Sequence, residues 1–141
     1  MLHLIHPVLV HFGVAFVAAG AILEGYGLLA DRERARHVGG SMWGLGTILI
    51  VAVIASGYIA ANTIELPAAA TETLADHERQ GWVLLAALVL LQFWKGWFRG
   101  RLPARQRPLF ALALFLAAAL LFYSAWLGGR LVYGFGLGVG Q

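Results

Sequence analysis

Four long apolar segments dominate this sequence and leave it few ways to fold. They cover Pro7–Leu29, Gly40–Ala61, Gly81–Phe98 and Pro108–Leu127. A helix of about 20 residues, rising about 1.5 Å per residue, crosses the roughly 30 Å of hydrocarbon in a bilayer. Backbone groups in lipid must find hydrogen bonds within their own segment, so each segment is expected to be helical. The sequence therefore predicts an all-α membrane protein in which residues 1–141 form one up-down bundle of four transmembrane helices.

The composition agrees with a membrane protein. Hydrophobic residues make up 60% of the 141 residues, and charged residues only 12%. Soluble domains carry about 25% charged residues. A soluble domain of this size would have no partner for so much apolar surface.

Basic residues gather in two connections of the predicted bundle. Eight of the ten Lys and Arg residues lie after the first segment, or at the end of the third segment and beyond it: Arg32, Arg34, Arg36, Lys95, Arg99, Arg101, Arg105 and Arg107. The connection between the second and third segments is acidic instead. The positive-inside rule then places the basic connections in the cytoplasm and both termini outside. Because the positive charge has this topological explanation, nucleic acid is not expected as a partner.

The lack of cysteine restricts the chemistry. It excludes disulfides, thiolate metal sites and covalent haem attachment through a C-x-x-C-H motif. Any haem would be held non-covalently, by histidine or methionine. The sequence also lacks a G-x-S-x-G motif and a P-loop. A hydrolase or a kinase is therefore not expected.

Three histidines fall near the predicted outer surface. His11 lies one turn inside the first segment, His6 stands just before that segment, and His77 precedes the third segment. Counting along each helix places them about 10, 18 and 16 Å from the bilayer centre, respectively. An imidazole at membrane depth is costly, so a functional site is the first hypothesis. We expect His11 and His77 to face each other, whereas His3 and His37 are expected to be solvated or interfacial.

Facing imidazoles in a dry slot are what non-covalent haem b requires. Arg79 and Arg130, on the same side, could pair with the haem propionates. The protein would then pass electrons to or from a partner protein or a quinone, and a homodimer would help to cover the haem. Two other hypotheses remain open. One is a zinc or copper site made by His6, His11 and His77, and the other is a cofactor-free accessory subunit in which histidines hydrogen-bond between helices.

Two end motifs resemble those of a known family. The run His6–Phe12 reads HPVLVHF, and the run Gly128–Gly136 reads GGRLVYGFG. Together with a histidine before the third segment, His77, they resemble the DUF2231 family of bacterial membrane proteins. The resemblance implies a four-span domain of the bacterial inner membrane, and a redox role beside cytochrome or Rieske-type proteins. Where some members carry a further histidine in the closing motif, this chain has Arg130 and Phe135.

The tryptophans and one acidic residue complete the expected membrane frame. Tryptophan prefers the interface between lipid and water. All five are therefore expected to be anchors at one surface or the other: Trp43, Trp82, Trp94, Trp97 and Trp126. Glu24 is the one acid inside an apolar segment, and we expect it to reach the interface or to pair with an arginine of the next connection.

Overall fold

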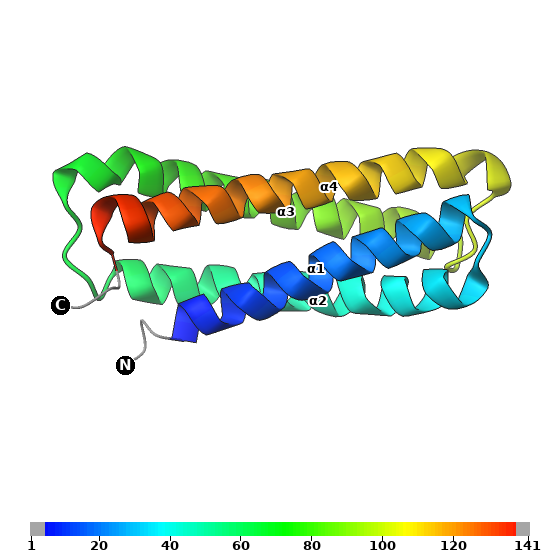
Figure 1. Cartoon of the computed structure of the whole chain (residues 1–141), viewed down its shortest axis with the longest axis horizontal. Coiled ribbons are helices and arrows are strands. Elements are labelled where there is room, and N and C mark those ends of the chain that lie inside the picture. The colour runs from blue at the N-terminus through cyan, green and yellow to red at the C-terminus, as the bar shows by residue number, and fades with distance from the viewer. Residues whose placement is uncertain (1–4, 138–141) are drawn as a thin grey trace.

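The computed structural model describes residues 5–137 and shows four long helices lying lengthwise beside one another (Figure 1). Helices α1 (Ile5–Leu29) and α2 (Glu33–Ala61) form the first hairpin, and α3 (Thr71–Trp97) and α4 (Arg107–Gly129) form the second. No strand occurs within these residues. The prediction of an all-α fold is therefore confirmed.

Three of these helical regions are long and apolar enough to cross a membrane. They are Ile5–Leu29, Glu33–Ala61 and Ala104–Gly134. Among the described residues, helix α3 is long enough but is not apolar enough to be counted with these three. Its apolar stretch is diluted by Gln80, Gln92 and Lys95, although it runs the length of the bundle like the others (Figure 1).

The helices extend past the apolar segments into polar sequence. Helix α2 begins within the basic connection, and α3 begins ahead of its apolar part, after the short 3-10 helix η2 (Ala68–Ala70). A second 3-10 helix, η3 (Ala104–Gln106), leads into α4. Helix α4 ends at Gly129, and a π-helical turn, η4 (Arg130–Gly134), follows it directly. Hydropathy locates the lipid-facing part of a helix, whereas charged residues such as Glu and Arg also sustain helices.

Glycines bring α1 and α2 together, backbone against backbone. Gly20 of α1 lies against the backbone of Trp43, and Gly39 of α2 lies against the backbone of Glu24. A Cβ at either glycine would overlap those atoms. Gly27 and Gly46 make similar contacts one heptad further along each helix. Lipid offers no hydrophobic drive for helices to associate, so this close packing of small residues supplies the attraction.

Larger side chains fill the space between the two hairpins. The buried core joins leucines of α3 and α4 to Trp43 and Phe110, which are both 0% exposed. The two rings lie 6.3 Å apart between centroids. Trp43 is therefore a core residue, and the expectation that it anchors the helix at the interface is wrong. Helix α2 directs the Trp43 side chain into the bundle. The position of Trp43 along the apolar segment predicts its depth in the membrane but not this direction.

A buried ion pair links the two hairpins. Glu24 is fully buried, and its Oε1 lies 2.6 Å from Nζ of Lys95 on α3. The indole N–H of Trp43 donates to the other carboxylate oxygen. Gly40 leaves the room that the pair needs, because a Cβ there would overlap the ammonium group. Glu24 thus neither reaches the interface nor pairs with a nearby arginine, as the sequence had suggested, because its partner comes from the third helix.

We expect Gly39→Ala to destabilise the bundle by about 1–3 kcal/mol, the usual cost of overpacking. The added methyl group would press on the backbone of Glu24, which cannot move independently of α1. Gly96→Ala is the matched control, since nothing lies within 4 Å of its added Cβ and alanine is the better helix former. Thermal unfolding of the detergent-solubilised protein would compare them. Equal midpoints for both variants would contradict the proposed backbone contact.

Lys95→Met alone should lower the free energy of unfolding by about 3–5 kcal/mol, because it leaves a buried carboxylate without its cation. Adding Glu24→Gln removes the remaining charge and should restore most of that loss. Chemical unfolding of the single and double variants in micelles would measure the coupling. Strictly additive losses would show that the two side chains do not depend on each other.

Candidate cofactor site

A cavity of about 180 Å³ lies at the end of the bundle where the described chain begins and ends. All four helices and η4 contribute to its wall, which is mostly aliphatic. Its polar lining includes His6, Tyr58, His77, Glu78 and Ser124. The cavity is thus an apolar space that two imidazoles enter from different hairpins.

His6 reaches from the first turn of α1 to α2. Its Nδ1 lies 3.1 Å from the carbonyl oxygen of Val53 and 3.0 Å from Oγ of Ser56. A carbonyl oxygen can only accept, so Nδ1 carries the proton and donates it. The neutral ring then keeps its lone pair on Nε2. The ring packs against Gly57, where a Cβ would come within 3.1 Å of Cε1.

His77 makes the corresponding contacts between α3 and α4. Its Nδ1–H donates to the carbonyl oxygen of Ser124 at 3.0 Å. The ring packs against Gly128, where a Cβ would come within 3.2 Å of Cε1. Burial lowers the pKa of His77, which precedes the apolar part of α3, and this outweighs the opposite effect of the Ser124 carbonyl. The ring is therefore neutral at pH 7, with its Nε2 lone pair available.

The two histidine environments are equivalent along the chain. Each imidazole donates to a carbonyl 47 residues later, and the glycine beneath each ring follows that carbonyl by one helical turn. One constant offset relates the first set to the second: His6 to His77, Val53 to Ser124, and Gly57 to Gly128. Few other positions match at this offset, which is why the repeat is hard to find in the sequence. Each hairpin thus presents one imidazole in the same way.

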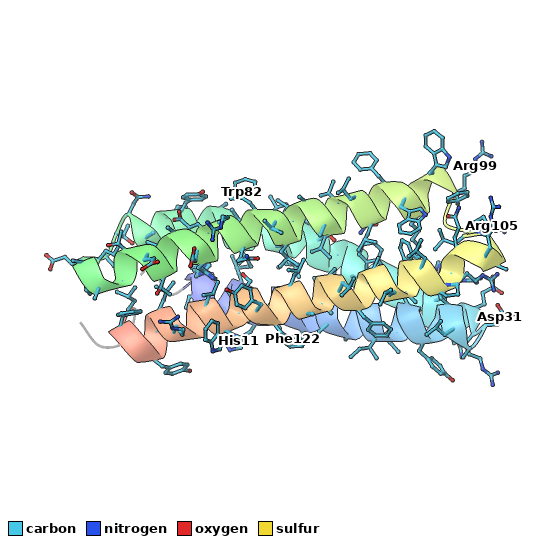
Figure 2. All side chains as sticks on the ribbon, turned by 90° about the horizontal axis from the view of Figure 1, so that it is seen from above. His11, Asp31, Trp82, Arg99, Arg105 and Phe122 are labelled. Atoms are coloured by element: carbon cyan, nitrogen blue, oxygen red, sulfur yellow. The ribbon has the colours of Figure 1, made fainter. Side chains whose placement is uncertain are left out.

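The structure brings His6 and His77 to one cavity, and it places His11 elsewhere. His11 is exposed (Figure 2), and its Nδ1 lies 2.6 Å from the carbonyl oxygen of Pro7 on the same helix. Helix α1 already includes His6, so five residues turn the two rings about 140° apart. The expected facing pair of His11 and His77 is therefore replaced by His6 and His77.

The two candidate arginines lie outside the cavity. Arg79 is exposed and forms an ion pair of 2.8 Å with Asp76. Arg130 stacks over Trp126, with 5.2 Å between its Cζ and the centroid of the ring. Across residues 5–137, no three His, Asp or Glu side chains gather closely enough to hold a metal ion. His3 lies outside the described residues.

Comparison with known proteins identifies one family. A protein-family model described as "Predicted membrane protein (DUF2231)" matches residues 2–141, nearly the entire chain. No curated protein and no solved structure matches the chain.

Proposed function

We propose that this chain, which belongs to the DUF2231 family of predicted membrane proteins, crosses the bacterial inner membrane with all four long helices. Helix α3 is the least apolar of them, but two of its polar side chains have partners inside the bundle. Gln92 donates to Oγ1 of Thr47 at 3.4 Å, and Lys95 pairs with Glu24. Polar side chains in membrane helices are tolerated where they face the bundle and are bonded there.

The orientation follows from the two basic connections, which meet at one end of the bundle. Asp31, between α1 and α2, accepts a hydrogen bond of 2.7 Å from Arg107 at the start of α4. This end lies opposite the end where the described chain begins and ends (Figure 1), which holds the histidine cavity. The positive-inside rule supports a cytoplasmic basic end, and the cavity would then face the periplasm together with both termini.

Single cysteines would test this orientation, since the chain has none of its own. Ala104→Cys, in η3 at the basic end, should react with a thiol reagent only after the membrane is permeabilised. Thr63→Cys, in the connection between α2 and η2, should react in intact cells. The reverse labelling pattern would place the histidine cavity in the cytoplasm and overturn the assignment.

For the cavity we propose a bis-histidine site for haem b, which makes the protein an electron-transfer subunit of the membrane. One observation carries this proposal. His6 and His77 both donate Nδ1–H to a backbone carbonyl, and both line the same cavity. Histidines that bind metals commonly fix their second ring nitrogen in this way, which orients the ring and fixes its tautomer.

The residues present suit such a group. The two Nε2 atoms make no hydrogen bond within the described chain, and both would be free to bind the haem iron. The mostly aliphatic wall suits an apolar macrocycle, and Gly57 and Gly128 let both rings lie close to their helices. Bound haem supplies reversible one-electron transfer, whose potential depends on its axial ligands and burial. The partner in that transfer would be a cytochrome, a Rieske-type protein or a quinone.

Absorption spectra of the purified protein, reconstituted with haem, would test the site. We expect His6→Ala and His77→Ala each to abolish the reducible bis-histidine spectrum. His11→Ala and His37→Ala remove a histidine outside the cavity and should leave that spectrum unchanged.

Other outcomes would replace the proposal. A wild-type protein without a Soret band but with bound zinc or copper would favour a metal site. The absence of both haem and metal would leave the imidazoles as hydrogen-bonding struts between helices. If the His6 and His77 variants kept the full spectrum, these residues would not be the ligands.

A further inference from the structure

A second pocket lies at the basic end of the bundle, between the beginning of α2 and the end of α3. It is wide and open, with a volume of about 770 Å³. Its ionisable lining residues are Arg34, Arg36, His37, Lys95, Arg99 and Arg101, with a single carboxylate, Glu33. We call this site the basic pocket. It is independent of the histidine cavity and of any cofactor bound there.

Most of the positive charge in the basic pocket has no internal partner. Lys95 is neutralised by Glu24. Elsewhere at this end, Arg107 pairs with Asp31. By contrast, the four arginines of the basic pocket form no ion pair within residues 5–137. Like charges held together at one place repel each other, and an anion of matching size would relieve that repulsion.

The turn after α3 holds part of this charge in place. The backbone N–H groups of Phe98 and Gly100 both donate to the carbonyl of Lys95, at 3.2 and 3.0 Å. Gly100 has a φ of +77°, which reverses the chain, and the N–H of Arg101 donates to the carbonyl of Phe98 at 2.9 Å. The turn therefore fixes the backbone of Arg99 and Arg101, which both line the basic pocket.

Exposed apolar side chains stand on both helices that flank the basic pocket. On α3, Phe93 and Trp97 are 72% and 85% exposed, and on α2 Val38 is 45% exposed. The site therefore has two kinds of surface: cationic side chains at the end of the bundle, and exposed apolar side chains beside them. These match the two parts of a phospholipid, its charged headgroup and its acyl chains.

We propose that the basic pocket binds the phosphate of an anionic phospholipid headgroup. Arginine suits this role because its planar guanidinium group donates two parallel hydrogen bonds to phosphate oxygens. Basic pockets between membrane helices on the cytoplasmic side are typical sites for anionic lipids. The neighbouring apolar side chains favour a lipid over a soluble phosphate compound, which would leave them in contact with water.

The test uses the full chain in nanodiscs of phosphatidylcholine that contain increasing fractions of phosphatidylglycerol. The lipid retained by the protein is counted by native mass spectrometry. We expect one phosphatidylglycerol to be retained preferentially, and Arg34→Gln or Arg101→Gln to weaken its retention about fivefold, the effect of roughly 1 kcal/mol per basic side chain.

Arg105→Gln is the matched control. It removes the same charge from the same end of the bundle (Figure 2), but Arg105 lies in η3 and does not line the basic pocket. Its lipid retention should equal that of the wild type. Equal losses in all three variants would reveal only a general attraction to anionic membranes and would overturn the proposal.

Inorganic phosphate added to pure phosphatidylcholine discs separates the two sources of the anion. We expect inorganic phosphate to leave the thermal midpoint unchanged, whereas phosphatidylglycerol raises it in the wild type and raises it less in Arg34→Gln. A shift with phosphate as large as that with phosphatidylglycerol would assign the basic pocket to a soluble phosphate compound and overturn its assignment to lipid.

Discussion

The close approach of α1 and α2 is the contact on which the rest of the bundle depends. Gly20 and Gly39 let the two backbones meet, so no side chain can lie between the helices there. The large side chains of this region, Glu24 and Trp43, instead occupy the core that the first hairpin shares with the second. A buried carboxylate needs a cation in a medium of low polarity, and Lys95 of α3 provides it. The glycine contact therefore decides how the second hairpin docks.

The two hairpins are related by an approximate repeat, which explains where the polar groups meet. The offset that relates His6 to His77 also relates Glu24 to Lys95. The ion pair and the histidine cavity thus lie at two levels along the bundle, and each joins residues at equivalent positions of the two hairpins.

The repeat is not symmetric in its packing. The glycines of the first hairpin correspond to larger residues in the second: Gly20 to Leu91, Gly27 to Phe98, Gly39 to Phe110, and Gly46 to Ala117. Helices α3 and α4 are accordingly held apart by side chains, while α1 and α2 are in backbone contact. The wider separation gives room to the core aromatics, which include the edge-on contact of Trp94 with Phe110 at 5.3 Å. The hairpin of α1 and α2 is thus closely packed, whereas the hairpin of α3 and α4 leaves more room for core side chains.

The sequence by itself determined the helical class, the approximate positions of the helices, the clustering of basic residues and membership of the family. These properties depend on composition and on neighbours along the chain, which hydropathy and short motifs record directly. Only the tertiary structure decided that His6, and not His11, shares a cavity with His77. It also decided that Glu24 pairs with Lys95 and that Trp43 is buried. Each of these depends on the rotation of a helix about its own axis, which is set by contacts with distant helices and which depth along a segment does not reveal.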